Sequence, residues 1–279
     1  MESLSIKKAY VDSEYGQVHY RYAVPPQVTR DTLVFLHKSA SSSISYTKLI
    51  QHYSSAGHSC YAPDMPGFGG SFDPPPPAID IISTKGTRWY VDLFMSVFEA
   101  LGLADKGFHI IGHHSGASLA TEMAAVYPDK VKSICLVGAS IMSAEERAKM
   151  KEQYFAPFNK PVPDGSHLLK TWDYLRGMGV GDDLDLFQRE AIDHIRAWKG
   201  RNQIYGAIWG QDKETYFKMV KCPIVVMCAR DDVLWAHAEN AKKHRSDVPL
   251  IEVKGANFSL DRDAEGIITH WTQLIDKAS

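Results

Sequence analysis

The sequence predicts an α/β fold with a mostly parallel central sheet, helices on both faces and a helical cap insertion. First, short apolar runs alternate with helix-like stretches along most of the chain, a pattern typical of parallel sheets. Second, this alternation stops between Ser140 and about Glu214, where the sequence is helical or irregular. Third, the 279 residues, 44% of them hydrophobic and 23% charged, suffice for a globular protein with a sizeable core.

Each predicted strand is an apolar run of the length expected for a buried strand in a parallel sheet. These runs cover residues 32–37, 59–63, 108–112, 133–138, 223–229 and 249–255. Between them, residues 87–103 and 117–126 have helical patterns. The opening stretch AYVDSEYGQVHYRYAV indicates an antiparallel hairpin at the sheet edge that turns near Gly16. The proline cluster at 71–80 is expected to form a stiff surface loop.

The break in the alternation divides the chain into a core and an inserted cap. Residues 1–139 are predicted to form the first part of the α/β core, and residues 140–215 the helical cap or lid. Residues 216–279 complete the core, with the chain returning to the sheet at Cys222-Pro223.

Composition and charge narrow the classes of function. The net charge is −2 and the basic residues are scattered, so we expect no nucleic-acid partner. No apolar run approaches a membrane span and the start lacks the apolar core of a signal peptide, so we expect a cytoplasmic protein without membrane association. The four cysteines lack metal-site spacing, and the chain has neither a phosphate-binding glycine loop nor a dinucleotide fingerprint. We therefore expect no metal and no cofactor.

The segment GHHSG, residues 112–116, follows a predicted strand and precedes a predicted helix. A sharp turn between strand and helix can present one side chain at the edge of a sheet, provided that small residues flank it where the two backbones nearly touch. Gly112 and Gly116 supply those small residues. The residue presented at the centre of the turn is His114.

Five segments resemble the α/β-hydrolase-fold superfamily, in members with a single cap insertion. They are LHKSASSSISYTKLI, YAPDMPGFGGS, GHHSGASLATEMAAVYPDKV, PIVVMCARDDVLW and KGANFSL, and they occur in the family's order. The resemblance covers nearly the whole chain. It implies the α/β-hydrolase fold, with an oxyanion loop, an Asp-x-Pro-Gly loop, a nucleophile turn and two segments that carry the acid and the base.

Position by position, the resemblance places an unusual set in the triad. The nucleophile position falls on His114, the acid on Asp232 and the base on Asn257, so the chain is identified as an atypical member with His/Asp/Asn in place of Ser/Asp/His. A Ser-His-Asp mechanism needs a hydroxyl beside an imidazole that accepts its proton. Asp231 is an alternative acid, although the spacing from Pro223 favours Asp232.

Two serines flank this set. A nucleophilic Ser115 would require the turn to shift by one residue and would put a histidine where a glycine-sized residue is needed, which disfavours it. The resemblance implies instead that the backbone N–H groups of Ser115 and Ser39 form the oxyanion hole. Backbone donors persist when side chains change, so an anion-binding arrangement is expected to remain.

An imidazole facing two amide donors suits acid/base chemistry beside a carbonyl group. We therefore expect a cofactor-independent enzyme in which His114 acts on a small, mainly apolar carbonyl compound, as a lyase, isomerase, cyclase or decarboxylase in specialised metabolism. One alternative is a hydrolase of an ester or lactone in which His114 activates water. Another is a non-catalytic protein that binds a small ligand.

The substrate is expected in the cleft between cap and core, the usual ligand site of this fold. The candidate lining residues, taken from the loops and the aromatic-rich cap, are His37, Lys38, His167, Trp172, Trp209 and Phe258. For His37, a structural role at the end of its strand is the competing interpretation. His113 is expected to pack or to hydrogen-bond inside the scaffold. The sequence leaves open whether the protein forms a homodimer.

Overall fold

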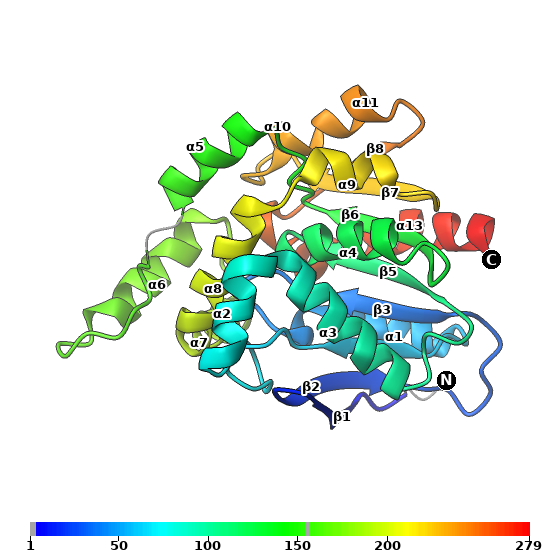
Figure 1. Ribbon diagram of the computed structural model, residues 1–279, viewed down its shortest axis with the longest axis horizontal. Helices are drawn as coiled ribbons and strands as arrows, with labels where there is room; N and C mark the ends of the chain where they lie inside the picture. Colours follow the sequence, from blue (N-terminus) through cyan, green and yellow to red (C-terminus); the bar gives the residue numbers. More distant parts are fainter. Residues whose placement is uncertain (1–3, 155–156) are drawn as a thin grey trace.

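The structure, a computed structural model, describes residues 4–154 and 157–279. One eight-stranded sheet runs through its centre in the order β1-β2-β4-β3-β5-β6-β7-β8, with helices on both faces (Figure 1). The strands are β1 (Lys7–Ser13), β2 (Gly16–Ala23), β3 (Thr32–Leu36), β4 (Cys60–Pro63), β5 (Phe108–His113), β6 (Val131–Val137), β7 (Ile224–Ala229) and β8 (Leu250–Val253). This arrangement confirms the predicted fold class.

The helices cover the sheet and build the cap. Around the core lie α1 (Thr47–Ser55), α2 (Pro76–Lys85), α3 (Thr87–Ala100), α4 (Ser115–Val126), α10 (Trp235–Ala238), α11 (Asn240–His244), α12 (Ser259–Arg262) and α13 (Ala264–Ala278). Between β6 and β7 lie α5 (Ala144–Tyr154), α6 (Ser166–Gly177), α7 (Leu184–Arg196), α8 (Trp198–Gly210) and α9 (Lys213–Met219). None of the helices in these described ranges is both long and apolar enough to cross a membrane.

The first two strands form the antiparallel hairpin that the sequence predicts. Ser13 pairs with Gly16 across a two-residue turn, and β2 then pairs antiparallel with β4. The six remaining strands, β4, β3, β5, β6, β7 and β8, pair in parallel. The hairpin therefore extends one edge of an otherwise parallel sheet.

Alternating side chains along each central strand feed two separate cores, because neighbouring residues of a strand face opposite sides of the sheet. In β3, Val34 and Leu36 belong to the core under α3 and α4, whereas Leu33 and Phe35 belong to the core under α1 and α13. Figure 1 shows α3 and α4 in front of the sheet and α1 and α13 behind it. The layers hold the carboxyl ends of the parallel strands in a fixed position.

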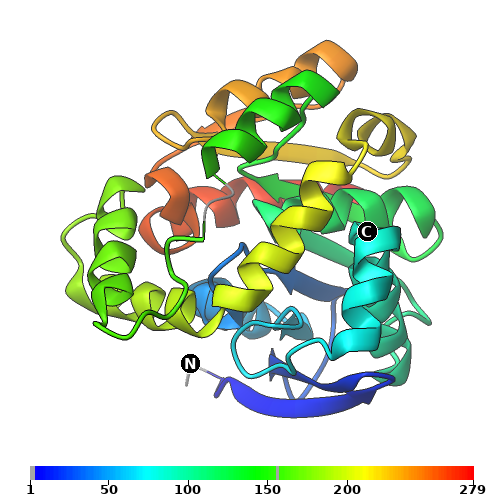
Figure 2. The ribbon, with the colours of Figure 1, turned by 60° about the vertical axis from the view of Figure 1, so that its left-hand side comes forward.

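The helices α5 to α8 lie beyond those carboxyl ends, whereas α9 packs against α4 over the sheet (Figures 1 and 2). They arise from the single stretch of chain between β6 and β7, where the sequence alternation stops. The domain boundaries at 139/140 and 215/216 stay a prediction, and α9 spans the second of them.

The proline cluster is only partly the loop that the sequence predicts, because α2 begins inside it at Pro76. Proline is compatible with the first turn of a helix, since the N–H that it lacks has no acceptor there. The expectation of an extended loop is therefore wrong for residues 76–80.

Candidate functional site

His114 lies on the sharp turn between β5 and α4, with backbone angles φ 48° and ψ −107°. A positive φ is costly for a residue with a Cβ atom, and among the described non-glycine residues only His114 and Ala256 adopt one. A Cβ atom on Gly112 would overlap the Gly116 carbonyl, and one on Gly116 would overlap the Leu36 carbonyl. The flanking glycines thus let strand and helix meet closely enough to present the imidazole.

The His114 ring is fixed by a carboxylate. Its Nε2 lies 2.8 Å from Oδ2 of Asp232, which is buried in the loop after β7 and also accepts a 2.8 Å hydrogen bond from the Leu234 N–H through Oδ1. An ionised carboxylate only accepts, so the neutral imidazole donates through Nε2–H and keeps its lone pair on Nδ1. The arrangement leaves Nδ1 as the basic atom of a ring that lines a cavity.

Gly138, which follows β6, makes room for this ring. A Cβ atom there would overlap His114 Cδ2, and its φ of 60° also favours glycine. The sequence analysis did not identify Gly138 as a site residue. In the sequence, Gly138 is visible only as a glycine at the end of a buried apolar run. A glycine at such a position has many structural explanations.

The two predicted oxyanion donors lie together, but the Ser115 side chain already occupies one of them. The Ser39 N–H donates to Oγ of Ser115 over 2.6 Å, so the hydroxyl occupies the position where a ligand oxygen would bind that amide. The Ser115 N–H is in the first turn of α4, where a backbone donor lacks an intrahelical acceptor. A ligand oxygen that uses both amides must displace the hydroxyl.

Asn257 occupies the expected region but is not joined to the His114–Asp232 pair. Its Oδ1 accepts from the Val233 N–H over 3.2 Å, and its Nδ2 lies 3.2 Å from Met178 Sδ. Within the described residues, no hydrogen bond links the Asn257 side chain to His114 or Asp232. The prediction of a three-membered polar set is therefore corrected, because the Asn257 amide is engaged by Val233 and Met178 instead.

The alternative acid, Asp231, has a different role. Its Oδ1 accepts a 3.1 Å hydrogen bond from the Ala256 N–H and so ties the loop after β7 to the segment before α12. Asp232 is the member of the pair that contacts the imidazole.

A cavity of about 60 Å³ opens in front of His114, inside a crevice that holds about 670 Å³ when its mouth is included. It is lined from the core by Lys38, Ser39, His114, Ser115, Ser140, Val233, Leu234, Asn257 and Phe258, and from the cap by Met150, Tyr174, Leu175, Met178, His194, Tyr205, Ile208 and Trp209. The enclosed part holds only a few water molecules. A larger ligand therefore requires the cap side chains to move.

Of the predicted lining residues, Lys38, Trp209 and Phe258 border this cavity. The prediction is wrong for His37, which is buried and bonded on both sides, by Nδ1 to the Lys38 carbonyl and by Nε2 to the Met65 N–H. This leaves no free ring nitrogen to face a ligand.

The prediction is also wrong for two residues of α6. Trp172 stacks on Phe187 with ring centroids 3.9 Å apart, which anchors α6 to α7. His167 accepts from the Val162 N–H over 3.3 Å at the exposed start of α6. Composition identifies aromatic and histidine residues in the cap, but not the face of the helix that carries them.

Lys38 takes the place of a glycine in the family's oxyanion loop and lies at the base of the cavity. Its Nζ donates to the Asn257 carbonyl over 2.8 Å, lies 3.6 Å from the centroid of the Phe258 ring and is 3.5 Å from Glu190 Oε2. Burial lowers the pKa of Lys38, with the negative charge of Glu190 opposing that effect.

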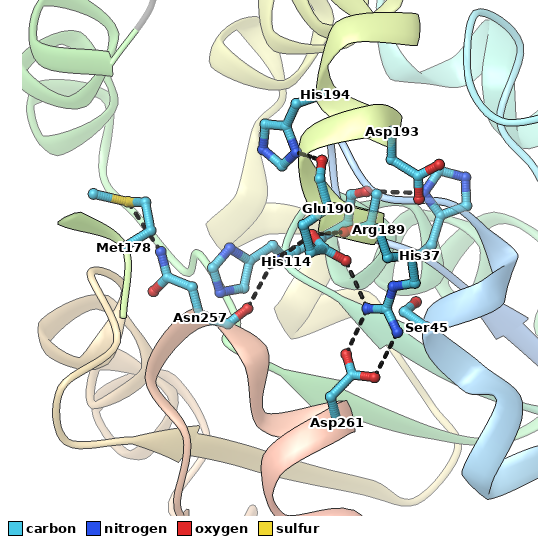
Figure 3. A network of polar contacts seen from close by, with 12 residues as sticks. His37, Ser45, His114, Met178, Arg189, Glu190, Asp193, His194, Asn257 and Asp261 are labelled. Carbon is cyan, nitrogen blue, oxygen red and sulfur yellow. Dashed lines mark hydrogen bonds and ion pairs between the residues drawn. The ribbon is translucent and has the colours of Figure 1, made fainter. Parts of the chain in front are cut away.

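Glu190, on α7, connects this lysine to a longer chain of charges (Figure 3). Arg189 donates to Glu190 over 2.7 Å and to both oxygens of Asp261, which belongs to α12. Burial alone would raise the pKa of Glu190, but Lys38 and Arg189 hold it at about 2. The cap is thus joined to the oxyanion loop and to α12 by alternating charges.

His113 packs beside the catalytic candidate. Its ring meets the His114 ring edge to face at 4.6 Å, and neither of its nitrogens has a hydrogen-bond partner among the described residues. Burial, and then the neighbouring His114, lower its pKa well below the ordinary value, so it is neutral. One ligand atom each from His113, His114 and Asp232 lies within 4.8 Å of the others, a spacing that could hold a metal ion.

The alpha/beta hydrolase fold family matches residues 31–201, more than half of the chain. The chain belongs to the α/β-hydrolase fold family. The predicted resemblance is thereby confirmed at the level of the superfamily.

The curated relatives match only about half of this chain. The chain is similar to "Probable lysophospholipase BODYGUARD 3" of Arabidopsis thaliana, with 30% identity over 136 residues, which are 47% of this chain and 26% of the relative. It is similar to a haloalkane dehalogenase of Mycolicibacterium paratuberculosis, with 28% identity over 157 residues, 55% of this chain and 49% of the relative. The chain therefore spans half or less of the length of these curated relatives.

Among solved structures, epoxide hydrolase A from Mycobacterium thermoresistibile has a TM-score of 0.79 at 15% identity, over 99% of both chains. At that identity the likeness concerns the fold alone.

Proposed function

We propose that this protein is a hydrolase of a small ester or lactone in which His114 activates water directly. The observation that carries the proposal is the His114 ring, held on the strained turn with Nε2 on Asp232 and Nδ1 unbonded among the described residues beside the cavity. Hydrolysis also agrees with the family and with the epoxide hydrolase of like fold. It therefore replaces the non-hydrolytic chemistry that the sequence favoured.

The proposed reaction follows from the roles of these groups. Nδ1 of His114 accepts a proton from water as its oxygen adds to the carbonyl carbon of the substrate. Asp232 stabilises the imidazolium that results, as the acid of a triad does. The carbonyl oxygen becomes an oxyanion that accepts from the Ser39 and Ser115 N–H groups after displacing Ser115 Oγ. The carbon–oxygen bond to the leaving group then breaks, and the imidazolium returns the proton to the leaving alkoxide.

The cavity supports a small and mainly apolar substrate. Its cap wall contains Leu175, Ile208 and Trp209 together with His194 and two tyrosines, and the polar groups of the core lie around His114 at the base. Such a division binds an acyl or ring portion against the cap and directs the carbonyl toward the amides. We propose the crevice between cap and core as the substrate site.

The test is turnover on a panel of aryl esters and lactones. We expect His114→Ala to lower kcat/KM by about 10²–10⁴-fold, the range of general-base contributions. His167→Ala, a histidine of the cap outside the cavity lining, is the matched control and should retain wild-type turnover. Turnover that persists unchanged in His114→Ala would contradict the proposal, as would an acyl-enzyme on Ser115 in quenched samples.

Proton abstraction beside a carbonyl is a second candidate, because the same base and donors would hold an enolate and the apolar cap wall restricts water. It predicts exchange of deuterium from solvent into the carbon beside the carbonyl of a bound ketone. Water-dependent cleavage without such exchange excludes this candidate for the compound tested. A non-catalytic binder predicts ligand binding without either reaction.

A further inference from the structure

A serine–lysine cluster lies behind the cavity wall and is not part of the His114 arrangement. Nζ of Lys213, at the start of α9, lies 2.8 Å from Ser140 Oγ and 2.9 Å from Ser118 Oγ. The two hydroxyl oxygens are 3.1 Å apart, so the three polar atoms form a closed triangle. It joins α4, the loop after β6 and α9.

Ser140 is the member of the cluster that reaches the substrate site. It lines the cavity that His114 also lines, and it borders a small void of about 10 Å³ that Ser118 and Lys213 line from behind. A hydroxyl in this position has a cavity on one side and an amine on the other. This is the relation between a nucleophile and its base in serine–lysine catalytic sites.

Lys213 has the environment of a base rather than of a structural cation. It is only 4% exposed, and no carboxylate oxygen of the described residues lies within ion-pair distance of its Nζ. Its hydrogen-bond partners are neutral hydroxyls, which stabilise the charge of an ammonium less than a carboxylate does.

Three charged or titratable groups face this amine from the surrounding elements. Arg147 of α5 disfavours its charge and Glu122 of α4 favours it, while the amine in turn lowers the pKa of His237 of α10. Burial has the largest effect, followed by Arg147, and together they lower the pKa of Lys213 to about 7. A substantial fraction of the amine is then neutral near pH 7 and can accept a proton.

We propose that Ser140 is a second nucleophile of this cavity, activated by Lys213 and assisted by Ser118, for acyl transfer from esters or similarly activated acyl compounds. The proposal goes beyond the His114 reaction, because it forms a covalent intermediate and uses a different base. It rests on the triangle of polar atoms and on the position of Ser140 between the cavity and the lysine.

The proposed reaction proceeds through an acyl-Ser140 intermediate. Ser140 Oγ bonds to the acyl carbon while its proton passes to neutral Lys213 Nζ. The bond from that carbon to the leaving oxygen breaks, and the proton on Nζ passes to the leaving alkoxide, directly or through the Ser118 hydroxyl. Water then adds to the acyl-serine carbon and gives a proton to Nζ. When the carbon–Oγ bond breaks, that proton returns to Ser140, and the carboxylic acid is released.

A purely structural cluster would make a different prediction from a catalytic one. Lysine in a structural role donates hydrogen bonds that tie α9 to α4, and arginine can donate similar bonds with a permanent charge. Arginine cannot accept the serine proton, because its guanidinium stays protonated. Lys213→Arg therefore separates the two roles.

The experiment is labelling of the full chain with a biotin-linked fluorophosphonate, with the adduct located by peptide mass spectrometry. We expect one adduct on Ser140, at a rate that rises with pH through about 7. Lys213→Arg should slow this labelling by about 100-fold or more, the lower range for loss of a general base. Lys221→Arg, at an exposed lysine, is the matched control and should label as the wild type does.

Several results would overturn the proposal. They are the absence of an adduct on Ser140 in the unaltered chain, an adduct on Ser115 instead, and a labelling rate that Lys213→Arg leaves unchanged. Thermal unfolding of Lys213→Arg shows whether the variant is folded, and the pH profile of the unaltered chain tests the base without any substitution. The two proposals fail separately when the turnover of His114→Ala is measured in a Ser140→Ala background, which lacks the Ser140 route, because the present test locates a stoichiometric adduct instead of measuring turnover.

Discussion

Asp193 offers a test of the structure that needs no substrate. It lies on α7, where its Oδ2 accepts a 2.8 Å hydrogen bond from Ser42 Oγ of the core. Burial, and then the negative charge of Glu190, raise its pKa from 3.8 to about 7. We expect Asp193→Asn to stabilise the protein at pH 8, because an amide oxygen can still accept from Ser42 without placing a second charge beside Glu190.

The sign follows from proton binding. Below pH 3.8 the carboxyl is protonated in both the folded and the unfolded chain, and it contributes no pH dependence. Between that value and about 7 the folded chain keeps a proton that the unfolded chain releases, so the free energy of unfolding falls as the pH rises. Above about 7 both states are ionised and the full penalty remains.

The magnitude follows from the same interval. About 1.4 kcal/mol per pH unit gives an upper limit of roughly 4 kcal/mol. The side chain is only partly buried, so solvent screening reduces the expected gain to about 1–2 kcal/mol at pH 8. Asp193→Asn should thus exceed the wild type by about 1–2 kcal/mol at pH 8 and by little or nothing at pH 4.

The assay is urea unfolding at intervals from pH 4 to pH 8, with the free energy and its slope against urea fitted at each pH. Asp182→Asn, an exposed aspartate just before the same helix, is the matched control and should show no comparable pH-dependent gain. The reasoning is refuted if the difference between Asp193→Asn and the wild type is the same at pH 4 and pH 8, or if the variant is less stable at pH 8.

Three further variants test the core and the turn. Gly138→Ala should push the His114 ring away from Asp232, since its Cβ would overlap the imidazole, and ester turnover should fall by about 100-fold in steady-state assays while the protein stays folded. Asp232→Asn removes a charge-assisted hydrogen bond of about 1.5–3 kcal/mol, so kcat should fall by about 10–150-fold; an unchanged kcat would exclude a role for the pair. Trp271→Ala should cost about 3–5 kcal/mol in urea unfolding, because this fully buried ring packs on Phe35 and Tyr53, and a loss below 1 kcal/mol would contradict the packing.

The parts of the site that the sequence predicted are those fixed by local backbone chemistry. Gly112 and Gly116 can be recognised because a turn that brings strand and helix into contact excludes side chains at those positions. Their spacing placed His114 on the turn, and the spacing from Pro223 placed Asp232 after β7. Each of these inferences uses residues that are close together in the chain or a motif with a fixed residue spacing.

The parts that it could not predict depend on contacts between distant segments. Asn257 aligns with a triad position, yet its amide bonds to the Val233 backbone, which no motif records. The meeting of Lys213 with Ser118 and Ser140 needs α9 to lie against α4, and an isolated lysine in a cap sequence carries no sign of that. Whether Trp172 or Trp209 reaches the cavity depends on the side of the helix that carries it. The amino-acid composition does not reveal that side.

The chain of charges from Lys38 through Glu190 and Arg189 to Asp261 has a consequence for how a ligand enters. Glu190 belongs to α7, so any movement that lifts this helix withdraws the counter-ion of a lysine beside the oxyanion amides. Such a movement would separate opposite charges while it widens the cavity for a ligand. Salt and water in the open crevice would favour the separated state, and a dry, apolar ligand would favour reclosure. A movement of α7 would therefore change access to the cavity and the electric field inside it together.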